Sequence, residues 1–395
     1  MAIYGQVVVG PPGAGKTTYC NGMQQYLRLI GRETLVVNLD PANEFHDTAA
    51  DTDTDTATPS KETHKESHLP YDVILDASED IINLSSVMEQ LNLGPNGGLI
   101  YCIEYIEHHV STLIELLTTR IDEYLAVNEG SPPPYLLFDF PGQVELYTHN
   151  TSVQKILALL VKKMDLRLTA IHLVDAHSCA DASKFISAAL LSTTTMLRLE
   201  LPAVNVLSKI DLLGGYGEGS IPFNLDFFVE CQELDRLLPY LEGLGEMMHG
   251  DGMDDEVEQR IMEDEDYRKA RAKTRNTRFY KRYHKMHREL CEVIDDYSML
   301  SYVPLNINDA ASVGRLVGRI DKCNGYVFTG RKRATGKEDS KSNIEDMFKC
   351  AMQVDSEWGY EQIADIQERF MVGSFQEEVP ELKRKAEEKH GRTIT

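Results

Sequence analysis

The sequence lacks the hallmarks of several protein classes. No apolar stretch approaches the roughly 18 residues of a membrane-spanning helix, so we expect no membrane segment. The seven cysteines include no CxxC or CxxH pair, which argues against a zinc site or a disulfide framework and indicates reduced thiols in a cytosolic or nuclear protein. An apolar segment that begins at Ile3 runs directly into a glycine-rich loop, so we expect no signal peptide.

Basic residues are scarce relative to acidic ones. The 40 lysines and arginines against 63 aspartates and glutamates give a formal net charge of −23. Such a surface repels phosphate backbones and anionic lipids, so we expect no direct nucleic-acid partner and no membrane partner. The 395 residues, 42% of them hydrophobic, suffice for a sizeable core in one large domain or two ordinary ones.

Short β-branched segments alternate with amphipathic helical segments. The strand-like segments are Ile3–Val9, Thr34–Leu39, Tyr135–Phe138, Thr169–Val174, Ala203–Leu207 and Ser301–Pro304. The helical patterns include Lys16–Ile30, Val153–Met164, Ala182–Leu197 and Phe227–Leu238. This alternation predicts an α/β fold with a mostly parallel sheet and helices on both faces.

Two segments have the composition of insertions. Residues 45–68 are rich in Asp and Thr and poor in large apolar side chains, so we expect a disordered insertion. Residues 241–276 turn from acidic to basic, and we expect a charged insertion that is either a surface helix or a flexible excursion. Residues 331–395 are linker-like and then partly helical, with an amphipathic stretch at Ile344–Phe370. The sequence therefore predicts one domain at residues 1–330 and a C-terminal tail.

The segment "GPPGAGKT" at residues 10–17 fits the phosphate-binding pattern G-x-x-x-x-G-K-[ST] and lies between a strand-like and a helical segment. Glycines allow backbone N–H groups to curl around a phosphate, and Lys16 supplies a charge to the β- and γ-phosphates. Thr17 supplies a hydroxyl ligand for Mg²⁺. The sequence thus predicts a P-loop NTPase, whose loop binds nucleotide through Gly13, Ala14, Gly15, Lys16, Thr17 and Thr18.

Two further strand ends carry candidate catalytic groups. In "LLFDFPGQ", we expect Asp139 to hold Mg²⁺, Gly142 to offer its N–H to the γ-phosphate, and Gln143 to orient the attacking water. In "VVNLDPANE", Asp40 leaves the second strand toward the same edge of the sheet and is a second candidate for positioning or deprotonating that water. The sequence leaves the choice between Asp40 and Gln143 open.

The segment "SKID", Ser208–Asp211, ends the fifth strand-like run and predicts guanine recognition. A carboxylate at Asp211 accepts hydrogen bonds from N1–H and the 2-amino group of guanine, donors that adenine does not offer in that arrangement. We expect Lys209 to lie along the base. Ser208 replaces the asparagine of the commonest guanine motif. The segment "PLNI" after the last strand offers backbone amides to the guanine O6.

A last motif is "LNLGPNGGLIYC", in which five turn-forming residues interrupt an apolar run. We expect a loop here, with Gly94, Pro95 and Asn96 at its centre. The amide of Asn96 offers a hydrogen-bond donor without adding charge.

In sum, the chain resembles the GPN-loop GTPase family through GPPGAGKTT, NLDPANE, LGPNGG, DFPGQVEL, HLVDAH, SKID and SYVPLNI, in that order. The resemblance implies a switch that binds GTP or GDP with Mg²⁺ and forms a homodimer or a heterodimer with another GPN-loop GTPase. It also implies that Asn96 enters the neighbouring subunit's active site. Related ATPases use a second lysine across the dimer, and Pro11 holds that place here.

The resemblance further implies a role in assembly and nuclear import of RNA polymerase II and related polymerases, in the cytoplasm with shuttling to the nucleus. The expected catalytic residues are Lys16, Asp40, Asn96 and Gln143. Two alternatives stay open: a small-molecule P-loop kinase, which usually brings several arginines to the transferred phosphate, and a nucleotide-stabilised scaffold without significant hydrolysis.

Overall fold

The computed structural model describes residues 2–42, 69–128, 132–216, 221–241, 265–275, 277–297 and 299–326. The insertion expected at residues 45–68 and the tail expected at residues 331–395 lie outside the described residues. The chain forms two compact units. The first unit comprises Met1–Ala170 with Arg198–Leu201, and the second comprises Ile171–Leu197 with the chain from Pro202 onward.

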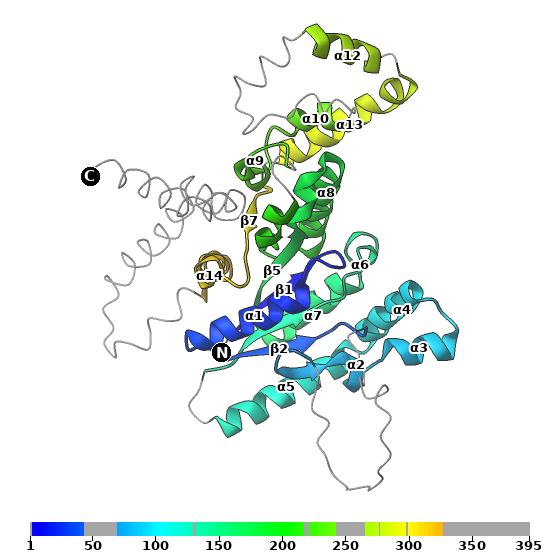
Figure 1. Ribbon diagram of the computed structural model, residues 1–395. Coiled ribbons are helices and arrows are strands. Elements are labelled where there is room, and N and C mark those ends of the chain that lie inside the picture. The colour runs from blue at the N-terminus through cyan, green and yellow to red at the C-terminus, as the bar shows by residue number, and fades with distance from the viewer. Residues whose placement is uncertain are drawn as a thin grey trace, which may run out of the picture. The chain divides into compact units, whose positions relative to one another are not determined.

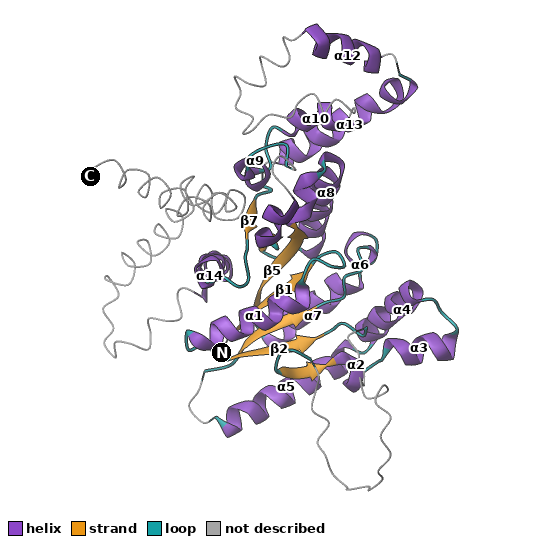
Figure 2. Cartoon of the chain, viewed as in Figure 1, coloured by secondary structure: helices purple, strands orange, loops and turns teal. Residues whose placement is uncertain are grey.

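The first unit alternates strands and helices, as Figures 1 and 2 show. Its elements are β1 (Ile3–Val9), α1 (Lys16–Leu29), β2 (Thr34–Asn38), β3 (Val73–Asp76), α2 (Ala77–Asp80), α3 (Leu84–Leu91), α4 (Pro95–His108), α5 (Val110–Val127), β4 (Tyr135–Asp139), α6 (Glu145–Thr148), α7 (Ser152–Met164) and the first part of β5 (Leu166–Asp175).

The second unit holds the end of β5 and is mainly helical. Its further elements are the 3₁₀ helix η1 (Ala176–Ala180), α8 (Ala182–Leu199), β6 (Ala203–Ser208), the 3₁₀ helix η2 (Ile210–Tyr216), α9 (Leu225–Glu230), the 3₁₀ helix η3 (Leu234–Leu237), α10 (Leu238–Leu241), α12 (Glu265–Arg275), α13 (Arg278–Tyr297), β7 (Tyr302–Pro304) and α14 (Ala310–Asn324).

The strands form a seven-stranded sheet in the order β3-β2-β4-β1-β5-β6-β7. The pairs β1–β4, β2–β3, β2–β4 and β6–β7 are all parallel. Parallel strands end at the same edge, and the register places Asp139 opposite both Val8 and Asn38. The α/β fold predicted from the sequence is therefore confirmed, and the ends of β1, β2 and β4 lie level with one another.

Two sequence predictions of secondary structure were wrong. The expected helix Phe227–Leu238 is three short elements, α9, η3 and α10, because Cys231 and Glu233 adopt positive φ angles of 52° and 56° between them. The strand β3 was not expected, since "VILD" is only four residues long and follows the acidic segment.

Helix α1 shows how local sequence sets the first unit's packing. It begins after Gly15, whose φ of 90° suits glycine, and ends where Gly31 adopts a φ of 79°. Its buried face carries Tyr19, Met23 and Leu27 at helical spacing and packs against β1, β2 and β4.

The second unit has its own hydrophobic core, formed by one face of α8, α9, η3, α13 and β7. Phe185 and Phe228 are fully buried and meet edge to face with ring centroids 4.9 Å apart. Truncation of such a ring to alanine costs about 3–5 kcal/mol of folding free energy. None of the described helices is long and apolar enough to cross a membrane.

Candidate functional site

The loop between β1 and α1 has the backbone form of a phosphate cradle. Gly10, Gly13 and Gly15 adopt φ angles of 152°, 79° and 90°, a region that side-chain-bearing residues rarely occupy. Thr17 and Thr18 lie in the first turn of α1, whose N-terminal N–H groups carry partial positive charge. The sequence pattern G-x-x-x-x-G-K-T thus folds into a loop that suits an anion at a helix N-terminus.

Lys16 is held inside this loop. Its Nζ donates hydrogen bonds to the carbonyl oxygens of Gly10 and Pro11, both at 3.3 Å. Burial lowers the pKa of Lys16, and the nearby carboxylates of Asp139 and Asp40 partly offset that shift. The ammonium group therefore lies next to the cradle with its position fixed by the loop's own carbonyls.

Asp139 ends β4 and meets α1. Thr17 Oγ1 donates to Asp139 Oδ2 at 3.1 Å, and Tyr71 OH donates to the same oxygen at 2.9 Å. Burial raises the pKa of Asp139 to about 6, although the Tyr71 hydrogen bond acts against the rise. A buried hydroxyl and carboxylate in contact are the hard oxygen donors that Mg²⁺ prefers.

Asp40 follows β2 and is fixed by its neighbours. Its backbone N–H donates to Asn38 Oδ1 at 3.1 Å, and its Oδ1 accepts from the N–H of Ala42 at 2.9 Å. Asn38 in turn donates to Asp76 Oδ1 at 3.0 Å, which ties the end of β2 to the end of β3. Burial raises the pKa of Asp40, so the site holds a carboxyl group of increased basicity.

The segment after β4 brings Gly142 and Gln143 to the same region. A Cβ added at Gly142 would lie 2.7 Å from Lys16 Nζ and 3.0 Å from Pro12 Cα, so only glycine allows this approach to the phosphate loop. Gln143 Nε2 donates to Glu145 Oε2 at 2.7 Å. Among the described residues, Oε1 of Gln143 has no hydrogen-bond partner although it is buried. That oxygen is available to accept a hydrogen bond from a water molecule.

The residues expected to read the base lie in the second unit. Lys209 adopts a φ of 59° after β6, and its Nζ forms an ion pair with Asp175 Oδ2 at 2.9 Å. Ser208 Oγ donates to the carbonyl of Val174 at 3.1 Å. The chain after β7 runs beside this loop, because the N–H of Leu305 donates to the carbonyl of Leu207 at 2.8 Å. Asp211 is half-exposed at the start of η2.

The motif Gly94-Pro95-Asn96 is not the irregular loop expected from the sequence. Gly94 is the N-cap of α4, and Pro95 occupies its first turn, where a missing N–H costs nothing. Asn96 is exposed, so its amide group projects from the first turn of a helix. The turn-forming residues separate two helices. Helix α3 is capped at its C-terminus by Asn92, whose φ is 52°, and α4 begins directly after Gly94.

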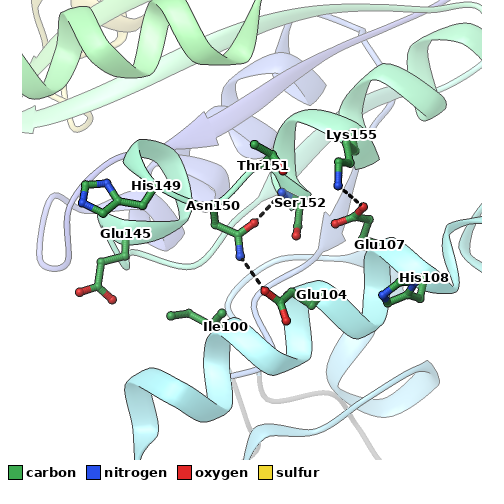
Figure 3. Close-up of a pocket in the computed structure, with 10 residues that line it drawn as sticks. All are labelled: Ile100, Glu104, Glu107, His108, Glu145, His149, Asn150, Thr151, Ser152 and Lys155. Atoms are coloured by element: carbon green, nitrogen blue, oxygen red, sulfur yellow. Dashed lines mark hydrogen bonds and ion pairs between the residues drawn. The ribbon is translucent and has the colours of Figure 1, made fainter.

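A cavity of about 610 Å³ lies between α4 and the α6–α7 segment, with the residues of Figure 3 around it. Two side-chain contacts link α4 to α7 and the turn before it. Asn150 Nδ2 donates to Glu104 Oε1 at 3.3 Å, and Lys155 Nζ pairs with Glu107 Oε1 at 2.7 Å (Figure 3). The helix that carries Asn96 is therefore joined to the segment that follows Gln143.

Five of the residues predicted from the sequence come together at one edge of the first unit: Lys16, Thr17, Asp40, Asp139 and Gly142. Sequence reasoning missed Tyr71, which binds Asp139, and the Asn38–Asp76 pair. Asp76 carried only a weak signal, because the apolar segment that it ends is four residues long. Tyr71 carried none, since it follows the acidic segment without a motif.

Comparisons with known proteins agree with the motif pattern. A family model described as "Conserved hypothetical ATP binding protein" matches residues 8–70 and 65–326. GPN-loop GTPase QQT1 of Arabidopsis thaliana is 40% identical over 369 residues, which cover 93% of this chain and 97% of that protein. GPN-loop GTPase 2 of Danio rerio is 41% identical over 82% of each chain. GPN-loop GTPase 2 of Saccharomyces cerevisiae is 35% identical over 82% of this chain and 75% of its own.

A solved structure is also similar, that of PAB0955, a GTPase in apo form from Pyrococcus abyssi. The match has 17% sequence identity and a TM-score of 0.46, and covers 81% of this chain and 97% of that one. This likeness is too distant to carry any part of the argument.

Proposed function

The chain is a GTPase that belongs to the GPN-loop family, and we propose that it works as a Mg²⁺-dependent dimeric switch. The observation that carries the proposal is the contact of Thr17 with Asp139 at 3.1 Å, beside a glycine cradle that holds Lys16. A hydroxyl, a buried carboxylate and a buried lysine at a helix N-terminus form the polar set that a nucleoside triphosphate with its metal requires.

The residues fit a bound Mg²⁺. Burial raises the pKa of Asp139 and of Asp40, and a divalent cation would relieve the cost of keeping these carboxylates charged. Thr17 and Asp139 would hold the ion, which supplies charge neutralisation of the phosphate oxygens.

The chain's own residues perform the remaining tasks. Lys16 shifts its hydrogen bonds from the loop carbonyls to the β- and γ-phosphates, and Gly142 offers its N–H to the γ-phosphate. Asp40 accepts a proton from the attacking water, because its raised pKa makes it a better base than an exposed aspartate. Gln143 Oε1 accepts a hydrogen bond from that water and so helps to orient it.

Guanine selection is assigned to the second unit. Asp211 accepts from N1–H and the 2-amino group, and Lys209 lies along the base, held by its ion pair with Asp175. The family model's description names ATP, whereas the relatives' names specify GTP, so nucleotide preference is a direct test. Asp211→Asn should weaken GTP binding by a few kcal/mol and favour xanthosine triphosphate over GTP relative to the unaltered chain.

Asn96 is proposed to act in trans, across a homodimer or a heterodimer with another GPN-loop GTPase. Its exposure at the start of α4 supports that role, since an exposed amide group can contact a second molecule. A neutral amide donor there would bind a phosphate oxygen of the neighbouring subunit's nucleotide.

A single-turnover assay with GTP, ATP and xanthosine triphosphate tests the enzymatic part. We expect Mg²⁺-dependent hydrolysis of GTP, slow without a partner since no arginine lies in the phosphate motifs. Asp40→Ala should keep GTP affinity and lose turnover, because a water-positioning group acts mainly in the transition state. Equal turnover in the two proteins would remove Asp40 from the mechanism.

The cellular part of the proposal is assembly and nuclear import of RNA polymerase II and related polymerases, by a chain that shuttles between cytoplasm and nucleus. It rests on the family resemblance alone. Affinity purification from cells, with Asp40→Ala to prolong the GTP state, should enrich polymerase subunits or their assembly factors. Their absence from both nucleotide states would contradict this role without touching the GTPase assignment.

A further inference from the structure

Helix α13 presents an apolar seam that the described residues of its own unit do not fully cover. Its members recur at alternating spacings of four and three residues: Phe279, Tyr283, Met286, Leu290, Val293 and Tyr297. This is the heptad spacing of a helix that packs along a second helix. We call these six residues the α13 seam.

The seam differs from the face that α13 buries. Cys291 and Ile294 are buried and face the core of the second unit, where α13 packs against η3 and α10. In the seam, Phe279, Met286 and Val293 are 56%, 47% and 58% exposed. These three lie seven residues apart and so form a line along the helix, which marks an interaction surface more than scattered exposed residues do.

Charge divides α13 into two halves. Residues 278–288 carry five lysines and arginines and no acidic residue, and residues 289–297 carry four acidic residues and no lysine or arginine. The halves meet in two internal ion pairs, Lys285–Glu289 at 3.4 Å and Arg288–Glu292 at 2.8 Å. A helix whose charge reverses at its midpoint is complementary to a second copy of itself in the antiparallel direction.

We infer that α13 is a self-association surface, in which two copies of this chain pair antiparallel along the seam. The heptad spacing is consistent with one twofold register. It sets Phe279 of one copy opposite Tyr297 of the other, Tyr283 opposite Val293, and Met286 opposite Leu290. Every seam residue then meets an apolar residue, and the contact is isologous, as a twofold dimer requires.

The same register determines which charged residues beside the seam lie next to each other in the pair. Arg282 and Asp296 follow the seam on its exposed side, and both are exposed. In the antiparallel pair, Arg282 of each copy lies beside Asp296 of the other, which gives two equivalent ion pairs. Glu289 lies near the twofold axis and meets its own counterpart, but each is bound to Lys285. A 20-residue helix spans about 30 Å, so the contact is small and its formation depends on protein concentration.

Sedimentation velocity of the full chain without nucleotide, over a concentration series, tests the proposal. The unaltered chain should self-associate, and Met286→Glu should abolish this because it places a carboxylate in the seam. Arg282→Asp should weaken association about tenfold, since two attractions become two repulsions. Arg282→Asp combined with Asp296→Arg should restore it to within about threefold.

Lys281→Asp is the matched control, because it makes the same charge change one residue away and outside the seam. It should leave association unchanged. Equal weakening by Lys281→Asp and Arg282→Asp, or association that Met286→Glu does not alter, would overturn the proposal. The second result would place any dimer contact elsewhere, as on the surface around Asn96, and leave the proposed function intact.

The direction of the helix pair is tested by disulfide trapping in a background with Cys323→Ser and Cys350→Ser, since Cys323 is exposed and Cys350 lies outside the described residues. A mixture of Met286→Cys and Leu290→Cys chains should cross-link between unlike chains. Cross-linking of Met286→Cys chains with one another in preference would indicate a parallel pair and contradict the register. A chain that stays monomeric, with Met286→Cys alkylated faster once residues 331–395 are removed, would assign the seam to the chain's own tail and overturn self-pairing.

Discussion

Two regions of the first unit bear the motifs of one reaction, yet they are built in opposite ways. At the phosphate loop, Lys16 donates to a carbonyl oxygen of the loop, and Thr17 donates to Asp139. These side chains are largely buried. At the start of α4, Asn96 is exposed at the first turn of a helix. The first region is organised by its own chain before any ligand binds, and the second presents its functional group outward.

The difference indicates where each region's ligand comes from. Preorganised donors are effective for a nucleotide that enters the chain's own cradle, since little reorganisation is then required. An exposed amide on a helix start gains its partner only when a second surface arrives. The predictions below test whether the phosphate loop acts in cis and the α4 start acts in trans.

Lys16→Ala should have the largest effect. Loss of two charge-assisted hydrogen bonds to phosphate, at about 1.5–3 kcal/mol each, should weaken GTP binding by about 1,000-fold. Titration with a fluorescent GTP analogue measures this directly. Lys162→Ala, at an exposed lysine in the last turn of α7, is the control and should bind normally. Normal binding by Lys16→Ala would mean that the cradle is not the nucleotide site.

Asn96→Ala should keep GTP affinity and reduce single-turnover hydrolysis by about 100-fold, the usual cost of removing one donor to developing charge. A mixture with Lys16→Ala chains separates cis from trans. The intact cradle of the Asn96→Ala chain then faces the intact Asn96 of the Lys16→Ala chain, so the mixture should hydrolyse GTP although neither variant does alone.

Subunit exchange is measured separately in the same mixture, by native separation of chains that carry different tags. If exchange occurs and the mixture of single variants still stays as inactive as its components, Asn96 acts within its own chain. The contrast between the two regions would then lose its mechanistic meaning.

The sequence could predict that Lys16, Thr17 and Asp139 come together, because this arrangement depends on local sequence and on strand order. Gly15, Lys16 and Thr17 are consecutive, and Asp139 reaches them because parallel strands end at one edge. Tyr71 and the Asn38–Asp76 pair depend on the three-dimensional neighbourhood of β3, a strand too short to recognise. The start of α4 was misjudged because Gly, Pro and Asn mark helix starts as readily as turns.

Gly142→Ala and Gly97→Ala extend the comparison to backbone space. At Gly142 a Cβ meets Lys16 Nζ at 2.7 Å and backbone at 3.0 Å, so the phosphate loop must shift. A strain of about 1–3 kcal/mol predicts a roughly tenfold loss of GTP affinity. At Gly97 a Cβ meets nothing within 4 Å among the residues that the structure describes, and alanine favours the helix.

Gly97→Ala should therefore keep the melting temperature and GTP affinity but lower turnover a few-fold, because an approaching subunit needs that space. Thermal unfolding and single-turnover assays on both variants measure these effects. Gly98 differs from Gly97 in this respect, since a Cβ at Gly98 would lie 2.9 Å from the Leu84 side chain of the same chain. If Gly97→Ala hydrolyses GTP at the unaltered rate, no partner backbone comes close to this turn.

The smallest expected effect concerns the link between the two regions, the ion pair Lys155–Glu107. It joins α4, which carries Asn96, to α7, and a hydrogen bond from Lys155 lowers the pKa of Glu107. Lys155 is 55% exposed in its side chain, and such pairs contribute only about 0.2–1 kcal/mol. Glu107→Gln and Lys155→Met should thus each change stability little.

Their effect on turnover decides whether the link matters to the reaction. If the orientation of α4 sets the position of Asn96, each substitution should lower turnover about twofold to fivefold and the double variant no further, since both remove one interaction. Single-turnover rates at saturating GTP are compared for the two single variants and the double variant, with Lys162→Met as an exposed control on α7. Additive losses would show two independent surface effects, and α4 would then present Asn96 without help from the segment that follows Gln143.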